Sequence, residues 1–213
     1  MKISTIILDV DGVLIDSNKI IIETYQKTSK KLGLRTPSDS EITKILGKSL
    51  EEIVTILWPN SDKDLLMKEY RKFFLDLFIP PIDGAVETVK KLKELGFKLG
   101  LVSGKSKFFL EKHLREAGFD LNLFDIAIWD EATKNHKPHP EPLLFACKKL
   151  NVKPEEVLYV GDSQLDYECA KNAKVHYVSV LTGCLKEEEL RKIGVENIIS
   201  SVSDLPKFLK VDK

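Results

Sequence analysis

From residue 85 onward the sequence alternates short apolar runs with amphipathic segments, and this alternation constrains the fold more than any other feature. A short apolar run bounded by turn residues predicts a buried strand, whereas apolar residues that recur every three or four positions predict a helix. The predicted strands cover residues 3–8, 98–102, 124–129, 157–160, 175–180 and 197–199. The predicted helices cover residues 85–95, 107–117, 140–150, 165–172, 187–193 and 204–209. Strands separated by helices form right-handed crossovers, so the pattern predicts an α/β fold with a parallel sheet and helices on both faces.

The segment between the first strand and residue 83 differs, because it contains helix patterns only. Apolar positions recur at helical spacing from Ile21 to Leu32, and further helices are predicted at residues 40–46, 50–57 and 65–78. Two prolines and an Asp-Gly pair then end the helical pattern at residues 80–84. We therefore predict a Rossmann-like α/β core domain, residues 1–16 and 83–213, with an all-helical cap domain, residues 17–82, inserted after the first strand.

The composition limits the classes of partner. The chain has 213 residues, of which 43% are hydrophobic and 31% charged, and its formal net charge is zero. Such a chain can bury a core, and without an excess of basic residues we expect neither nucleic acid nor a membrane as partner. A strand that starts at residue 3 leaves no room for a signal peptide, and no apolar run is long enough to span a membrane. Three cysteines without metal-ligand spacing predict buried, reduced thiols in a cytoplasmic protein. For the oligomeric state we expect a monomer or a homodimer.

Two acids, Asp9 and Asp11, follow the first predicted strand directly. Residues two apart on a strand leave the same face. Two carboxylates about 4 Å apart repel by roughly 4 kcal/mol at an effective dielectric near 20, so a cation or a shared proton is needed to offset the repulsion. The alternative is ordinary turn chemistry, in which Asp9 caps a turn that Asp11 and Gly12 form.

Polar residues at the other predicted strand ends favour a functional site. Ser103 follows the second strand, Lys137 lies after the third, and Asp162 and Asp166 come after the fourth. Because the carboxyl ends of parallel strands meet at one edge of a sheet, we expect these side chains to converge with the two acids of the first strand. Several acids with one hydroxyl and one lysine suit a Mg²⁺ ion and a phosphate group.

The motifs DVDGVLIDS at residues 9–17, Ser103, KPHP at 137–140 and GDSQLD at 161–166 resemble, in this order, those of the haloacid dehalogenase-like hydrolases. The resemblance covers the whole core and the position of the cap, and it points to helical-cap phosphatases such as phosphoglycolate phosphatase. It implies an enzyme that hydrolyses a small phosphate ester with Mg²⁺ as cofactor. Asp11 favours phosphate over carbon–halogen chemistry, because a halide leaving group needs no proton.

The resemblance also implies a role for each acid. Asp9 would be the nucleophile that forms an aspartyl-phosphate, and Asp11 would protonate the leaving group and later deprotonate water. The side chains of Asp9 and Asp162, with the backbone carbonyl of Asp11, would bind Mg²⁺. Asp166 would be a further metal-site acid, acting directly or through water.

The same resemblance assigns five residues to the substrate. Ser103 and Lys137 would hold the phosphoryl oxygens, with the backbone N–H groups of Gly12 and Gly104 as further donors. Many relatives carry Asn or another polar residue where this chain has Gly104, so one substrate contact is absent. In the cap, Lys48 would meet a substrate carboxylate, or it would be a solvated lysine between two helices.

Phosphoglycolate is the first substrate that the resemblance suggests. One alternative is a phosphosugar mutase similar to β-phosphoglucomutase, which would use the same aspartyl-phosphate but return the phosphoryl group to a sugar. Another is a non-catalytic binding protein on this scaffold. The presence of both a nucleophile and an acid speaks against the binding protein, since binding requires neither.

Other residues near these motifs are expected to have no part in the chemistry. We expect His136 and His139 to be solvated loop residues. Lys105 and Lys107 are expected to begin a helix and face water rather than to add positive potential near phosphate. Four aromatic residues of the cap are expected to pack between helices rather than to line a substrate site, namely Tyr25, Phe73, Phe74 and Phe78.

Overall fold

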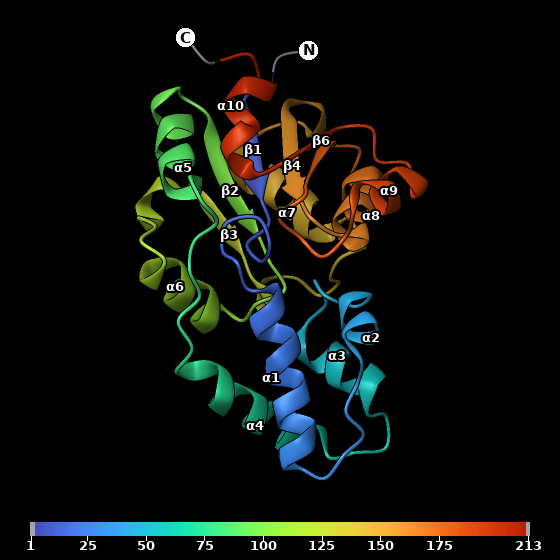
Figure 1. Ribbon diagram of the computed structural model, residues 1–213. Helices are drawn as coiled ribbons and strands as arrows, with labels where there is room; N and C mark the ends of the chain where they lie inside the picture. The colour runs from blue at the N-terminus through green and yellow to red at the C-terminus, as the bar shows by residue number, and fades with distance from the viewer. Residues whose placement is uncertain (1–2, 212–213) are drawn as a thin grey trace.

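A parallel sheet forms the centre of the larger part of the molecule (Figure 1). The computed structural model describes residues 3–211. The strands are β1 (Thr5–Leu8), β2 (Lys98–Val102), β3 (Ile126–Ile128), β4 (Val157–Gly161), β5 (His176–Val180) and β6 (Ile198–Ile199), in the spatial order β3-β2-β1-β4-β5-β6. The strand order reverses beside β1, between β1 and β4, and ligands bind at the carboxyl edge of such a reversal.

Helices cover both faces of this sheet. One face carries α5 (Ala85–Glu94), α6 (Lys107–Glu116) and α10 (Leu205–Phe208), and the other carries α7 (Glu141–Leu150), α8 (Gln164–Ala173) and α9 (Glu187–Lys192). The side chains of β1 explain this arrangement, because Ile6 and Leu8 pack into the core on the first face while Ile7 packs into the core on the second. A strand buried on both faces needs apolar residues at successive positions, as β1 has.

Four further helices form a cap beyond the carboxyl edge of the sheet, in the lower half of Figure 1. They are α1 (Asn18–Lys31), α2 (Asp39–Thr43), α3 (Leu50–Leu57) and α4 (Lys63–Leu75). α4 contacts both α1 and α3. The sequence starts α2 and α3 with capping boxes, Ser38 with Glu41 and Ser49 with Glu52, in which each serine and glutamate satisfy the other's backbone N–H.

Two neighbouring chain segments join this cap to the sheet. Ile15 and Pro81 form an antiparallel bridge. The backbone N–H of Asp16 donates to the carbonyl of Pro80 at 2.9 Å, and that of Ile82 donates to the carbonyl of Leu14 at 2.9 Å. The entry and exit of the helical insertion are therefore fixed to each other just after β1.

The predicted fold class is confirmed, since the structure has a parallel α/β sheet with a helical insertion after the first strand. Several predicted elements have other ends than expected: β1 begins at Thr5, β3 covers only Ile126–Ile128, α2 ends at Thr43, and α4 ends at Leu75 rather than at residue 78. Residues 44–48 form turns instead of a helix. The domain boundaries, residues 1–16 and 83–213 for the core and 17–82 for the cap, stay a prediction. Within residues 3–211 the structure has no helix that is long and apolar enough to cross a membrane.

The three cysteines are free thiols. Cys147 and Cys169 are buried as predicted, whereas Cys184 is half-buried. Burial raises the pKa of Cys147 to about 11 and the pKa of Cys169 to about 12, so both thiols stay protonated near neutral pH.

Candidate active site

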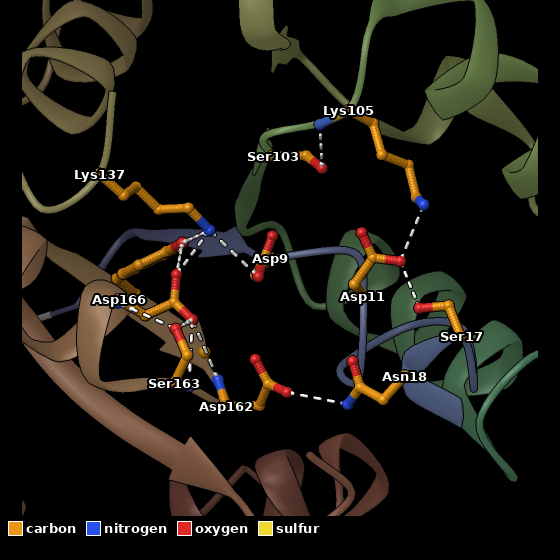
Figure 2. Close-up of polar contacts among 12 residues, drawn as sticks. Asp9, Asp11, Ser17, Asn18, Ser103, Lys105, Lys137, Asp162, Ser163 and Asp166 are labelled. Carbon is orange, nitrogen blue, oxygen red and sulfur yellow. Dashed lines mark hydrogen bonds and ion pairs between the residues drawn. The ribbon is translucent and has the colours of Figure 1, made fainter. Parts of the chain in front are cut away.

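The carboxyl ends of β1, β2 and β4 bring together three polar side chains that the sequence places at strand ends (Figure 2). Asp9 follows β1, and its backbone N–H donates to the carbonyl of Val160 at 2.9 Å. Ser103 follows β2 and donates in the same way to Ile128 at 2.9 Å, while Asp162 follows β4. Asp9, Ser103 and Asp162 are all buried. The sheet itself therefore fixes their positions.

A buried lysine links Asp9 to a second acid. Lys137 lies on the loop after β3, and its Nζ is 3.1 Å from Oδ2 of Asp9 and 2.7 Å from Oδ1 of Asp166. Burial opposes the charge of this ammonium, but Asp166 and Asp9 outweigh burial and hold the pKa of Lys137 well above its usual value. Lys137 therefore places a permanent positive charge beside Asp9.

Asp166, in the first turn of α8, is fully buried and accepts hydrogen bonds at both carboxylate oxygens. Oδ1 accepts from Lys137 at 2.7 Å and from the Tyr159 hydroxyl at 2.7 Å. Oδ2 accepts from the Ser163 hydroxyl at 2.6 Å and from the backbone N–H groups of Asp162 and Ser163 at 3.3 and 3.2 Å. Burial raises the pKa of Asp166, but Lys137 and the hydrogen bonds more than compensate and hold it below its usual value. Asp166 thus orients both Lys137 and the loop that carries Asp162.

Asp9, Asp162 and Asp166 form a buried acid cluster, with one carboxylate oxygen of each within 4.8 Å of the others. Oδ1 of Asp9 is buried, and within residues 3–211 no group donates a hydrogen bond to it. Burial raises the pKa of Asp9 to about 7, although Lys137 opposes this shift, and burial with the charges of Asp166 and Asp9 raises the pKa of Asp162 well above its usual range. The free oxygen of Asp9, together with two carboxyl groups whose pKa is raised, fits a hard divalent cation, which would stabilise the charged form of both acids. The acid cluster therefore implies a divalent metal ion.

Asp11 lies on the other side of Asp9 from Lys137 (Figure 2). Its Oδ1 accepts a hydrogen bond from the Ser17 hydroxyl and lies 2.9 Å from Nζ of Lys105. Asp9 and Asp11 line the same cavity, as their spacing predicts. The interpretation of Asp11 as a turn residue alone does not account for its ion pair.

The prediction that Lys105 faces water is wrong. Its side chain is only 6% exposed, and its Nζ lies 4.9 Å from the centre of the Phe74 ring in the cap. The chain turns inward after β2, where the Lys105 backbone N–H donates to the Ser103 hydroxyl at 3.2 Å, and α6 begins only at Lys107. Lys107 itself is exposed, as predicted.

Gly12 stands at a close approach between the segments that follow β1 and β4. Its φ is +71°, and a Cβ at this position would lie 2.2 Å from Oδ2 of Asp162 and 2.7 Å from Nδ2 of Asn18. Asn18 donates to that same Asp162 oxygen at 3.2 Å. The Gly12 N–H already donates to the carbonyl of Ile15 at 2.9 Å, so its predicted role as a phosphate donor stays a prediction.

Gly104 stands where the cap meets the end of β2. A Cβ at this position would lie 2.8 Å from the carbonyl oxygen of Gly47 and 3.0 Å from that of Lys48, which both belong to the loop between α2 and α3. The Lys48 side chain lies 3.8 Å from Glu52 and lines the cavity that contains Asp9. The space of the side chain missing from residue 104 is thus taken by the cap backbone.

A cavity of about 80 Å³ lies between the cap and the edge of the sheet. Tyr25 and Phe74 line it opposite the acids, and they also pack against other aromatic rings of the cap, Tyr25 with its ring centre 4.4 Å from that of Tyr70. The predicted packing is confirmed for Tyr25 and Phe74, which are each only 3% exposed, although both also line the cavity. Phe78 does not fit the prediction, because 61% of its surface is exposed.

His136 connects cap and core beside this cavity. Its Nδ1 lies 3.4 Å from a carboxylate oxygen of Glu52 in α3, and its Nε2 lies 3.3 Å from Oδ1 of Asp130. The prediction of a solvated loop residue is wrong for His136, which is half-buried, and is confirmed for His139, which is exposed.

A family model described as haloacid dehalogenase-like hydrolase matches residues 6–180. The chain belongs to this family. Pyrophosphatase PpaX of Bacillus cereus is 30% identical over 212 residues, which cover 98% of this chain and 97% of that protein. Pyrophosphatase PpaX of Halalkalibacterium halodurans is 32% identical over 208 residues, with 96% of each chain covered. A hydrolase from Pseudomonas syringae shares the fold, with a TM-score of 0.87 at 22% identity over 97% of this chain and 98% of that one.

Family membership and the site together establish the class of activity. The protein is a phosphatase of the haloacid dehalogenase-like hydrolases, with a buried acid cluster of Asp9, Asp162 and Asp166. This family and cluster imply a divalent metal and a small phosphorylated substrate.

Several residues of the site were not singled out from the sequence. Asn18 and Tyr159 bind the acids directly, and the Thr182 hydroxyl donates to the carbonyl of Gly12 at 2.6 Å. Tyr159 could have been identified from the sequence, because a tyrosine inside a buried strand needs a hydrogen-bond partner for its hydroxyl. Thr182 could not have been identified in this way, since it lies 170 positions from its partner Gly12 in the sequence.

Proposed function

We propose that the protein is a Mg²⁺-dependent phosphatase that transfers a phosphoryl group from a small phosphorylated compound to Asp9 and then to water. The observation that carries this proposal is the state of Asp9. One of its oxygens is held by Lys137, and the other is buried without a donor among the described residues. A buried carboxylate with one oxygen fixed by Lys137 and the other without a hydrogen-bond donor is suited to nucleophilic attack and metal binding.

Asp9 and Asp162, with the backbone carbonyl of Asp11, are the groups we expect to hold the cation. Asp166 is a weaker candidate for a direct ligand, because both its oxygens already accept hydrogen bonds from the protein. When bound, Mg²⁺ would supply positive charge that offsets the charge of the acids and the phosphoryl oxygens.

The chain's own residues divide the reaction into two steps. Asp9 would attack phosphorus and form an aspartyl-phosphate, while the leaving oxygen takes a proton from Asp11. A water molecule would then attack the phosphorus and pass its proton to Asp11. This attack would break the bond between phosphorus and Asp9, so that phosphate is released and the Asp9 carboxylate is restored. Lys137 and the Ser103 hydroxyl would hold phosphoryl oxygens, and Gly104 would add a backbone donor.

The sequence resemblance and the relatives point to two different substrates. The sequence resemblance suggests phosphoglycolate, whereas the curated relatives are named pyrophosphatases. Phosphoglycolate and pyrophosphate both present a phosphoryl group on a small leaving group. Both therefore belong in the first substrate panel.

The decisive experiment measures phosphate release from pyrophosphate, phosphoglycolate, sugar phosphates and nucleotides, with Mg²⁺ and with EDTA. We expect Mg²⁺-dependent release from at least one compound and a loss of about 1,000-fold or more in kcat for Asp9→Asn. Asp16→Asn is the matched control, because Asp16 is an exposed acid of the same motif, and we expect it to retain activity. No release from any compound by the folded protein with Mg²⁺, or full activity in Asp9→Asn, would contradict the proposal.

A further inference from the structure

Lys105 is a buried cation that the proposed reaction does not use. Lys105 and Lys137 are the two buried lysines within residues 3–211. Figure 2 shows that they approach the acids from opposite sides, Lys137 beside Asp9 and Lys105 beside Asp11. Burying an ammonium group is costly, so a second buried lysine in one small site calls for a function.

Lys105 lies next to the place where the leaving group of the substrate is expected. Asp11 is the proposed proton donor, so the leaving oxygen must lie within hydrogen-bond distance of its carboxylate. Nζ of Lys105 is 2.9 Å from Oδ1 of Asp11. Atoms bonded next to the leaving oxygen would therefore come within reach of the Lys105 ammonium.

The surroundings of Lys105 make it a stronger anion receptor than the other cations at the cavity. Lys48 and Arg71 also line this cavity, but the Lys48 side chain is 21% exposed and Arg71 is exposed on the cap, whereas the Lys105 side chain is only 6% exposed. Lys105 is covered by the Phe74 ring from the cap. A charge interaction shielded from water is worth more than one at the surface.

We propose that Lys105 recognises a second negative charge on the leaving group of the substrate. This inference rests on the proposed phosphatase function and adds the selectivity of the same site. With substrate bound, the ammonium pairs with a carboxylate or phosphate one or two bonds from the leaving oxygen and turns from Asp11 toward that group. The preferred substrates are small phosphate esters or anhydrides with an anionic leaving group, and esters of neutral alcohols are poor substrates.

The test compares Lys105→Met with the parent on three compounds: pyrophosphate, phosphoglycolate and ethyl phosphate, whose leaving group is uncharged. For the better of the two anionic compounds we expect kcat/KM to fall about 100-fold, mainly through KM, because a shielded charge pair is lost. For ethyl phosphate we expect kcat/KM to change by no more than about threefold, because its uncharged leaving group forms no ion pair with Lys105. Lys105→Arg, which keeps the charge, should retain part of the preference.

Lys107→Met is the matched control, because Lys107 is an exposed lysine two positions away with its Nζ over the Trp129 ring. It should leave all three rates unchanged.

An equal loss on all three compounds in Lys105→Met would show that Lys105 only positions Asp11 and would overturn the proposal. If Lys105→Met does not fold, the kcat/KM values of the parent protein test the inference. Equal values for ethyl phosphate and the anionic compounds would contradict it. Failure of the phosphatase proposal is distinct, because the parent would then release phosphate from none of them.

Discussion

His113 is a fully buried histidine on α6 whose two ring nitrogens have no hydrogen-bond partner within residues 3–211. Its ring stacks on Phe109 and meets the Phe74 ring edge-on, with centroids 5.5 and 4.9 Å away. Burial, with a smaller contribution from the charge of Lys105, lowers the pKa of His113 to about 3. The neutral imidazole therefore behaves as an apolar side chain with two unsatisfied polar atoms.

We predict that His113→Leu stabilises the protein, by about 1 kcal/mol at pH 7, because an apolar side chain leaves no buried polar atom unpaired. The gain should grow as the pH falls. Between the unfolded pKa near 6.5 and the folded pKa near 3, the unfolded chain binds a proton that the folded chain does not, so the parent loses stability with falling pH. For one proton this slope is at most about 1.4 kcal/mol per pH unit.

Urea unfolding of both proteins at pH 7.5, 6 and 5 measures this difference. A stability difference that stays constant across the three pH values would contradict the lowered pKa of His113. His139→Leu is the control, because His139 is exposed and leucine at this position should not stabilise the protein.

Residues at strand ends were predictable because the sheet alone determines where they meet. Asp9, Ser103 and Asp162 needed only the alternation of strands and helices, and all three are buried at one edge. The environment of Lys105 was not predictable in this way. It depends on an inward turn after β2 and on a ring of the cap, and neither leaves a periodic signal in the sequence.

At the level of elements, the contact between β2 and the cap loop depends on Gly104. Its φ is not among the positive values, so Gly104 is needed for space rather than for backbone conformation. A Cβ would push against two carbonyl oxygens of the loop at residues 47 and 48. Backbone atoms cannot rotate away as a flexible side chain can, so the cap itself would have to move.

We therefore predict that Gly104→Ala holds the cap away from the site and lowers kcat/KM roughly tenfold, because closure completes the substrate site. Its melting temperature should also fall, because a displaced cap loses packing on the core, where Phe74 contacts Phe109 and His113. Gly118→Ala is the matched control, which should lose stability alone. Gly118 has a φ of +89°, and a Cβ there would meet no atom within 4 Å, so alanine costs stability without changing the kinetics. Unchanged kinetics in Gly104→Ala would show that the loop tolerates the extra methyl group.

The elements themselves followed from sequence periodicity, whereas their ends did not. The helix predicted at residues 40–46 ends at Thr43, and the turns that replace its last part carry Gly47 and Lys48 to the site. Apolar spacing continues through this segment, because Ile45 and Leu46 pack against the core in turns just as they would in a helix. Tertiary packing decided the boundary, and one sequence cannot show it.

At the level of the whole molecule, the acid cluster couples metal binding to stability. Burial and mutual repulsion disfavour the charged carboxylates of Asp9 and Asp162 in the metal-free fold, and the neighbouring charge of Lys137 compensates only in part. A cation that binds the folded chain and not the unfolded one stabilises the fold by mass action. At a concentration of Mg²⁺ one hundred times its Kd the gain is about 2.7 kcal/mol, which for a chain of this size raises Tm by roughly 5 to 10 °C.

We predict that Mg²⁺ raises the melting temperature by this amount in calorimetry and that EDTA reverses the change. In Asp162→Asn the response should largely disappear, because one of two proposed side-chain ligands no longer carries charge. The metal-free variant should melt no lower than the metal-free parent, since asparagine removes a carboxylate that burial and two neighbouring acids disfavour. Asp16→Asn should respond to Mg²⁺ as the parent does. A Tm that does not depend on Mg²⁺ in the parent, or an equal response in Asp162→Asn, would mean that the acid cluster does not bind the cation, and catalysis would then need another source of positive charge beside Asp9.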